Sequence, residues 1–260
     1  MDITDLNEKA WDKAVEAGDN PYTRIVSSQA VADARAGFWA IRVSGVRTVP
    51  ADWFPPLKGL PVLCLASGGG QQAPILAAAG AEVTLVDASM GQLGQDAFAA
   101  KRDGLDLKLV QGDMADLSML ADESFGLVVN PVSTLFVPDV APVWRECRRV
   151  LRPGGTLIAG FMNPDEFVFD ADALDERGEF VVKYPLPYVE HETLGPDELQ
   201  ARIAADSMFH FSHTMEAQLG GMLAAGFVIT GFYEDRRPES DGNPIRFYQP
   251  SDYVVRAVAN

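Results

Sequence analysis

The chain has 260 residues, of which 47% are hydrophobic, and its formal net charge is −16 at pH 7. This length is enough to bury a complete core as one domain with an appended cap. The excess of acidic residues argues against a polyanionic partner, because proteins that bind DNA or RNA need a basic surface. We therefore expect no nucleic acid as a partner, and a small molecule or a peptide as the substrate.

The sequence contains no apolar run long enough to span a membrane, and Met1–Asp5 is acidic rather than typical of a signal peptide. The two cysteines, Cys64 and Cys147, suggest no disulfide framework. These features predict a cytoplasmic protein that does not associate with membranes. They leave the oligomeric state open.

Residues 1–57 are expected to form a helical cap ahead of the core. One helical pattern surrounds Trp11 and a second covers Ala30–Trp39, and Gly18–Pro21 separates the two. The segment ends at Trp53–Pro56, whose two prolines form a rigid connector to the first strand.

A glycine cluster follows the first predicted strand. The apolar run Pro61–Leu65 leads into Gly68–Gly70, and a helix-compatible segment follows at once. Glycines carry no Cβ, so a nucleotide-like ligand can approach the backbone closely. The second strand ends at Asp87, whose carboxylate can accept hydrogen bonds from both ribose hydroxyls. The segment therefore predicts an adenosine-containing cofactor.

The identity of that cofactor is open at this point. Gly68-x-Gly70-x-x-Ala73 satisfies the loose dinucleotide fingerprint, which favours a nicotinamide cofactor. A different adenosine-containing cofactor is the second interpretation. A glycine-rich turn without any ligand is the third, because this pattern alone is weak.

Three more strands follow the glycine loop and Asp87. The third covers residues 107–114 and carries Gly112-Asp113-Met114, and the fourth covers 124–131 and closes with Asn130-Pro131. An amphipathic helix over 144–151 then stops at the tight turn Arg152–Gly155. Thr156–Phe161 is the fifth strand.

The C-terminal part adds a polar insertion and a strand pair. Residues 163–213 are rich in aromatic residues, acids and prolines, and they contain all three histidines. A helix over Thr214–Ala225 ends at Gly226, and strands over Phe227–Tyr233 and Tyr253–Val258 follow. A closing antiparallel pair fits the all-parallel sheet of a nicotinamide dehydrogenase poorly.

At this point the sequence resembles the class I S-adenosylmethionine-dependent methyltransferases. The glycine loop, Asp87, Gly112-Asp113-Met114, the strand at Phe125 and the turn Leu151–Gly155 occur in the order and at the spacing of that family. The resemblance is strong over residues 60–162 and looser beyond. Ala66 stands where the family usually has its first glycine, and Cys64 and Gly126 stand where acids are frequent. Alanine is small, so we expect cofactor binding to be weakened little.

The resemblance implies an α/β fold with a Rossmann-like, mostly parallel seven-stranded sheet and an antiparallel C-terminal strand. Helices should cover both faces. It also implies an N-terminal cap (1–57), a cofactor-binding core (58–162), a lid and substrate insertion after strand five (163–213) and a C-terminal completion of the core (214–260). The function it implies is direct in-line transfer of a methyl group from S-adenosylmethionine to a small molecule, leaving S-adenosylhomocysteine. The alternatives are a non-catalytic protein that binds this cofactor and, less favoured, a nicotinamide-dependent oxidoreductase.

Cofactor roles follow by resemblance. Backbone groups of the loop should face the methionine moiety, Asp87 the ribose, Ala88 and Met90 the adenine face, and Asp113 with Met114 the adenine edge. Asn130 should lie beside the methyl group. The expected cofactor-binding residues are therefore Ala66, Gly68, Gly70, Asp87, Ala88, Met90, Asp113, Met114 and Asn130.

Catalysis needs a general base only if the acceptor loses a proton. Histidine is the natural candidate, and we expect His191 and His213 in that role, with Asn130 aligning the acceptor. Asn130-Pro131 resembles part of a motif of amino-group methyltransferases, but the second proline and the aromatic residue are missing. We expect no metal, because no ligand spacing accompanies the histidines. The acceptor atom stays open.

The walls of the acceptor pocket are expected from the two flanking segments, which concentrate aromatic residues and histidines. We expect Tyr22, Trp39 and Tyr188, with His191 and His213, to close over the methyl group and exclude water. At least two of the five should line the cavity.

Overall fold

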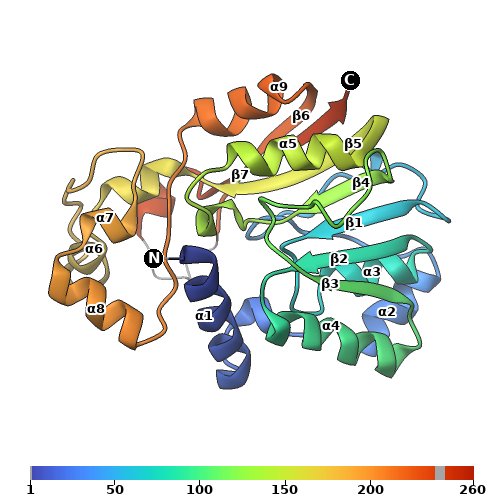
Figure 1. Cartoon of the computed structure of the whole chain (residues 1–260), viewed down its shortest axis with the longest axis horizontal. Helices are drawn as coiled ribbons and strands as arrows, with labels where there is room; N and C mark the ends of the chain where they lie inside the picture. The colour runs from blue at the N-terminus through green and yellow to red at the C-terminus, as the bar shows by residue number, and fades with distance from the viewer. Residues whose placement is uncertain (1, 238–243) are drawn as a thin grey trace.

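The computed structural model describes residues 2–237 and 244–260, and a seven-stranded sheet runs through it (Figure 1). The strand order is β3-β2-β1-β4-β5-β7-β6. β7 is antiparallel to β5 and β6, and the other neighbouring strands are parallel. The strands are β1 (Pro61–Leu65), β2 (Glu82–Asp87), β3 (Leu107–Gln111), β4 (Phe125–Asn130), β5 (Leu151–Met162), β6 (Phe227–Asp235) and β7 (Asp252–Ala259). The predicted sheet, with its one antiparallel strand, is confirmed.

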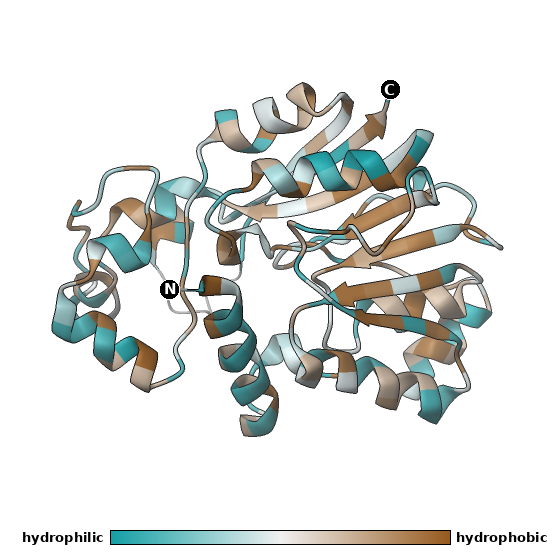
Figure 2. Ribbon diagram, viewed as in Figure 1, coloured by the Kyte–Doolittle hydropathy of each residue, from teal (hydrophilic) through white to brown (hydrophobic). Residues whose placement is uncertain are grey.

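Helices cover both faces of the sheet (Figure 1). They are α1 (Ile3–Ala17), α2 (Ser28–Arg35), α3 (Gln72–Ala78), α4 (Met90–Asp103), α5 (Ala141–Val150), α6 (Ala171–Arg177), α7 (Glu190–Thr193), α8 (Pro196–Ala204) and α9 (Gly221–Ala224). α5 and α9 lie on one face, and α2, α3 and α4 lie on the other. In Figure 2 the strands β1, β2, β3 and β4 are coloured mostly as hydrophobic.

The core follows from the alternation of side chains along the strands. In β1, Leu63 and Leu65 belong to the apolar cluster under α5, which includes Trp144. Val62 and Cys64 belong to the cluster on the opposite face. A strand buried on both faces is apolar throughout, because successive side chains point to opposite sides. Cys64 is therefore a core residue, and burial raises the pKa of its thiol.

The fifth strand begins earlier than predicted. Leu151 pairs with Phe125 and Thr156 with Leu127, so the register between β4 and β5 shifts at this point. The residues expected to form a separate turn are thus an irregular part of β5, in which Gly154 has a φ of 76°. The helix expected over 214–225 also differs, because a π-helical turn over Glu216–Gly220 precedes α9.

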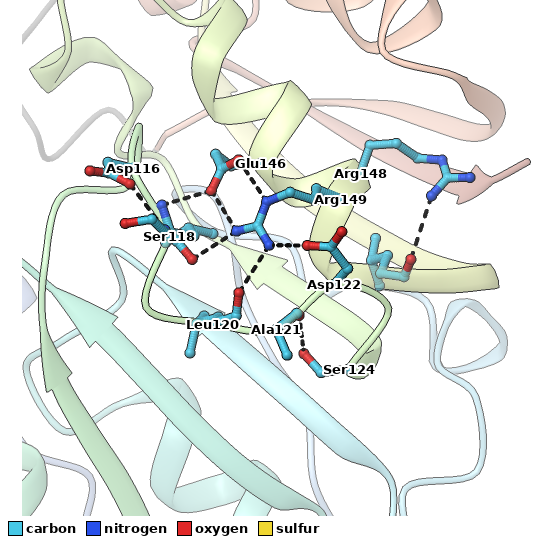
Figure 3. A network of polar contacts seen from close by, with 11 residues as sticks. Asp116, Ser118, Leu120, Ala121, Asp122, Ser124, Glu146, Arg148 and Arg149 are labelled. Atoms are coloured by element: carbon cyan, nitrogen blue, oxygen red, sulfur yellow. Dashed lines mark hydrogen bonds and ion pairs between the residues drawn. The ribbon is translucent and has the colours of Figure 1, made fainter.

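Arg149 of α5 fixes the loop that leads from β3 to β4 (Figure 3). Its guanidinium donates to Glu146 at 2.7 and 2.9 Å and to the carbonyl oxygens of Leu117 (2.7 Å) and Leu120 (2.9 Å). Asp122 accepts a further hydrogen bond at 2.5 Å. A planar guanidinium can satisfy several acceptors at once. This network anchors the loop that follows Asp113.

The N-terminal helix and the insertion pack on each other beside the carboxyl ends of the parallel strands (Figure 1). Ile3 of α1 shares a buried apolar cluster with Phe209 and Phe211. The Asn7 amide donates to the carbonyl oxygens of Phe136 (3.0 Å) and Phe209 (3.1 Å), and its oxygen accepts from the Phe209 N–H at 2.7 Å. The predicted division at residues 57, 162 and 213 stays a prediction.

Candidate cofactor and acceptor site

A cavity of about 700 Å³ lies at the carboxyl ends of the parallel strands. Its walls come from the glycine loop, from the ends of β2, β3 and β4, and from segments outside the core: α1, residues 20–22, residues 42–45, and residues 208 and 210. This volume lies within the range of 300–1,000 Å³ that is usual for small-molecule sites. The carboxyl edge of an open parallel sheet is also the usual place for a ligand.

The glycine loop is shaped by contacts within the protein. The Gly68 N–H donates to Asp87 Oδ2 at 2.9 Å. A Cβ on Gly68 would lie 2.6 Å from the Gln92 Cβ and 2.9 Å from Asp87 Oδ2, so a side chain does not fit there. Gly69 has a φ of 107°, and a Cβ on it would collide with the carbonyl oxygen of Tyr22. The loop therefore approaches β2 on one side and the N-terminal segment on the other.

Ala66 adopts the conformation for which glycine is the usual choice. Its φ is +46°, in the left-handed region that costs an L-residue energy. Its N–H donates to the Val86 carbonyl at 2.7 Å, which fixes the turn out of β1. The sequence predicted a small residue here, but not that the residue would be strained.

Asp87 and Asp113 stand at the ends of the adjacent strands β2 and β3, and both line the cavity. Asp87 Oδ1 accepts from the Ser89 N–H at 3.0 Å. Burial raises the pKa of Asp87 to about 6; the charge of Asp12 adds to this, and the N–H bonds from Gly68 and Ser89 oppose it. Asp113 Oδ1 accepts from the Ala115 N–H at 2.8 Å.

Asp96 of α4 holds the glycine loop by a hydrogen bond to its backbone. Its Oδ2 accepts from the Gly70 N–H at 2.9 Å, and the side chain is fully buried in α4. Burial raises the pKa of Asp96 to about 7, and the charge of Asp87 contributes. Its second oxygen and the Oε1 atom of Gln92, one turn earlier, are both buried without a hydrogen-bond partner. A proton on Asp96 supplies a donor among these acceptors, which agrees with the raised pKa.

Comparison with known proteins identifies the family. Residues 63–159 match a family model described as "Methyltransferase domain". The uncharacterized methyltransferase YbaJ of Bacillus subtilis is 50% identical over 230 residues, which are 88% of this chain and 89% of that protein. The chain belongs to the class I S-adenosylmethionine-dependent methyltransferases. Its cofactor is S-adenosylmethionine, and S-adenosylhomocysteine is the product.

Two further similarities are more distant. A ubiquinone biosynthesis O-methyltransferase of Dinoroseobacter shibae is 31% identical over 147 residues, 55% of this chain and 58% of that protein. A crystal structure of an S-adenosylmethionine-dependent methyltransferase from Mesorhizobium loti superposes with a TM-score of 0.61 at 19% identity, covering 80% of this chain and 94% of that one. The second similarity shows the fold. The strand order, with β7 between β5 and β6, is also unlike the all-parallel sheet of the nicotinamide alternative.

The cavity of this methyltransferase fits the cofactor at its adenosine end. Two carboxylates on adjacent strands line the same space, and so do Ala66, Ser67 and Gly68 of the glycine loop. Of the nine expected cofactor-binding residues, six line the cavity: Ala66, Gly68, Asp87, Ala88, Asp113 and Met114. Three do not, namely Gly70, Met90 and Asn130.

Each of those three has a structural reason. Gly70 is buried, and its N–H is taken by Asp96. Met90 begins α4 with an exposed side chain. Asn130 is fully buried and donates to the Leu65 carbonyl and to Ser133 Oγ, both at 2.9 Å. Asn130 itself therefore does not line the cavity, and its expected place beside the methyl group stays a prediction. It holds Ser133, which does line the cavity.

The two histidines expected in the acceptor pocket lie elsewhere. His213 is buried, and its Nε2 lies 2.9 Å from the Thr134 carbonyl oxygen. Burial lowers the pKa of His213. His191 packs against Phe211, with ring centroids 5.7 Å apart. Neither lines the cavity, whereas His210 does. On a helix, residues 210 and 213 would lie on one face. The segment is not helical, so the two histidines point to different surroundings, and the sequence did not indicate that His210 is the one at the cavity.

Of the five flanking residues expected to close the pocket, only Tyr22 lines it. Trp39 packs edge-on against Phe54 at 5.0 Å in the seam between the N-terminal segment and the core. Tyr188 stacks on Phe167 at 5.6 Å, and Phe167 is the ring that reaches the cavity. The expectation of at least two lining residues among the five is wrong.

Other lining residues were not predicted. Trp11 and Phe136 form an edge-on aromatic pair at 5.3 Å on the α1 side. Arg237 also lines the cavity, and the fully buried Asp252 holds its guanidinium at 3.1 and 3.2 Å. The helical pattern around Trp11 was the one signal that could have indicated the α1 side of the cavity.

Within residues 2–237 and 244–260, the structure has no group of three or more His, Cys, Asp or Glu side chains that could hold a metal ion. The same residues include no helix with the length and hydrophobicity required to cross a bilayer.

Proposed function

We propose that this methyltransferase transfers a methyl group from S-adenosylmethionine to a small molecule that binds in the same cavity, by direct in-line displacement. The observation that carries the proposal is one continuous cavity that extends from Asp87 and Asp113 to Pro131, Val132 and Ser133 at the end of β4. A cofactor that occupies the adenosine end leaves the other end for an acceptor. The sulfonium makes the transfer favourable, so the protein mainly has to align the two reactants.

The roles at the adenosine end follow from the contacts. The Asp87 carboxylate would accept from the ribose hydroxyls while it keeps its bonds to Gly68 and Ser89. Asp113 would accept from the adenine amino group, with the Met114 N–H and Ala88 beside the ring. Backbone atoms of Ala66 and Gly68 would contact the methionine moiety.

The acceptor end is enclosed by segments outside the core. Residues 1–57 and 163–213 would act as cap and lid, since Trp11, Tyr22, Phe167, Met208 and His210 line the cavity from both of them. Enclosure excludes water and favours aligned transfer. The enclosed space and the strongly negative charge of the chain both favour a small molecule over a nucleic acid.

The open space beside Ser133 favours a catalyst over a protein that only binds the cofactor, in which this region would be filled. The acceptor itself would be found by incubating the enzyme with methyl-labelled S-adenosylmethionine and a metabolite extract. Label should appear in a compound of low molecular mass. Label found only in protein or nucleic acid would contradict the proposal.

The cofactor is tested separately by thermal unfolding. S-Adenosylhomocysteine should raise the melting temperature, because a ligand that binds only the folded state stabilises it, and NAD should not. A larger shift with NAD than with S-adenosylhomocysteine would contradict the cofactor roles given to Asp87 and Asp113.

A further inference from the structure

The chain brings His210 to the cavity through an alternation of side chains. All three histidines are among the described residues, and His210 alone lines the cavity, next to Met208. Phe209 and Phe211 are buried in the cluster with Ile3. In an extended segment successive side chains point to opposite sides, and Phe211 forms an isolated antiparallel bridge with Val189. Burial of the two phenylalanines therefore directs His210 toward the cavity.

A buried carboxylate fixes the orientation of the ring. Glu190 Oε2 accepts the His210 backbone N–H at 2.8 Å and lies 3.2 Å from Nδ1 of the same residue. Glu190 Oε1 forms an ion pair with Arg202 at 2.6 Å. Burial alone would raise the pKa of Glu190, but the contacts with His210 and the charge of Arg202 hold it below its usual value. Glu190 is thus an acceptor at physiological pH.

This arrangement selects one tautomer of the imidazole. A carboxylate can only accept, so Nδ1 carries the proton that it donates to Glu190. The lone pair is then on Nε2, which has no hydrogen-bond partner among the residues that the structure describes. His213 differs in this respect, because its Nε2 is already occupied by the Thr134 carbonyl.

The surroundings of His210 indicate the kind of acceptor. Its ring lies 5.5 Å from the ring of Phe136, which also contacts Trp11, and all three line the cavity. Flat aromatic walls suit a ring-bearing ligand. A positioned base matters most for a hydroxyl, because a neutral hydroxyl is a poor nucleophile and must lose its proton during the transfer.

We infer that His210 is the general base, that Glu190 and Arg202 position it, and that the acceptor is a phenolic hydroxyl. This inference rests on the proposed function. When bound, the cofactor supplies an electrophilic methyl group, whose bond to sulfur breaks with its electron pair left on sulfur as the bond to the acceptor oxygen forms. His210 Nε2 takes the hydroxyl proton. The resulting imidazolium faces the Glu190 carboxylate and later releases the proton to solvent.

The first test is spectroscopic and needs no acceptor. In the protein labelled with ¹⁵N-histidine and saturated with S-adenosylhomocysteine, the His210 resonances should be those of the tautomer protonated at Nδ1. In Glu190→Gln, the amide can both donate and accept, so the other tautomer should become populated. His213, whose Nε2 lies 2.9 Å from the Thr134 carbonyl oxygen, should keep its tautomer in both proteins. A wild-type ring protonated at Nε2, or equal populations in the two proteins, would overturn the inference.

The second test uses paired probe acceptors, 4-methylphenol and 4-methylthiophenol, because the thiol ionises without help near neutral pH. His210→Gln should lower the rate with the phenol by about 100-fold or more and the rate with the thiol by less than about fivefold. Glu190→Gln should lower only the phenol rate, by about tenfold, and His191→Gln should change neither. S-Adenosylhomocysteine affinity, measured by calorimetry, should stay within about twofold of the wild-type value.

The outcomes separate the two proposals. Equal losses with both probes, or an unchanged rate with the phenol, would overturn the role of His210. If the wild-type enzyme accepts neither probe, the tautomer in the first test decides the inference. A wild-type protein that does not bind S-adenosylhomocysteine and labels no compound in the metabolite extract would instead overturn the proposed function.

Discussion

The hydroxyl of Thr4, at the start of the first helix, donates a hydrogen bond of 3.0 Å to Asp113 Oδ2 at the end of β3. This bond connects the N-terminal segment to the carboxylate that would accept from the adenine. Thr4 and three more residues of α1 line the cavity, so the helix forms part of its wall. The position of α1 and the orientation of Asp113 are therefore linked.

Thr4→Val should weaken the binding of S-adenosylhomocysteine about fivefold, or about 1 kcal/mol, because it removes a hydrogen bond that orients Asp113 and holds α1 in place. Isothermal calorimetry measures this directly. Thr4→Ser keeps the hydroxyl and should bind like the wild type. Tighter binding in Thr4→Val would show instead that Thr4 competes with the cofactor for the carboxylate.

Cofactor binding should depend on the ionisation of Asp87. Burial raises the pKa of Asp87 to about 6, and the ionised carboxylate accepts more hydrogen bonds than the neutral acid. The affinity for S-adenosylhomocysteine should therefore rise as the pH increases from 5 to 7. Asp87→Ala should weaken binding at pH 8 by roughly 1.5–3 kcal/mol and remove most of this pH dependence.

The matched control for Asp87 is Glu82→Gln, which changes an exposed carboxylate at the other end of the same strand. It should keep both the affinity and its pH dependence. Unchanged affinity in a folded Asp87→Ala protein would mean that Asp87 serves only the turn between Gly68 and Ser89.

The positions of the two carboxylates at the proposed adenosine end were predictable because backbone topology determines them. Asp87 and Asp113 each follow a parallel strand, and the carboxyl ends of such strands meet at one edge of the sheet. The sequence therefore places these two carboxylates near each other without knowledge of any side-chain contact. The same reasoning gives the fold, since the strand order depends on elements that are evident from their apolar runs.

The acceptor end was not predictable because tertiary packing determines it. Whether His191, His210 or His213 faces the cavity depends on the burial of Phe209 and Phe211 against α1, which is 202 residues away between Asn7 and Phe209. The direction of the Asn130 side chain was not predictable for the same reason. The residue lies at the end of β4 as expected, but its amide turns into the core to reach the Leu65 carbonyl.

Asp96 should make the cofactor-free protein less stable at higher pH. Its folded-state pKa is raised to about 7 from an ordinary value of 3.8, so the folded protein holds a proton that the unfolded chain has released. The free energy of unfolding should fall between pH 4 and pH 7. Asp96→Asn should abolish the contribution of Asp96 to this pH dependence. Between pH 5 and 8 the free energy of unfolding of the variant should exceed that of the wild type by roughly 1 kcal/mol or more.

Urea unfolding at several pH values measures the effect of Asp96. Asp87 and Glu166 also have raised pKa values, so the quantity to follow is the difference between Asp96→Asn and the wild type. Asp33→Asn, in an exposed part of α2, is the control and should leave the slope unchanged. Parallel pH profiles for Asp96→Asn and the wild type would contradict the prediction.

Ala66→Gly should stabilise the protein, although glycine usually destabilises. Ala66 has a φ of +46°, which costs an L-residue roughly 1–2 kcal/mol and a glycine almost nothing. The greater freedom of glycine in the unfolded chain offsets about 0.4–1 kcal/mol of this gain. The free energy of unfolding should therefore rise by up to about 1.5 kcal/mol. Ala97→Gly, at an exposed interior position of α4, is the matched control and should lower it by about 1 kcal/mol. Equal losses in the two variants, measured by urea unfolding, would show that the loop does not hold Ala66 in the left-handed conformation in solution.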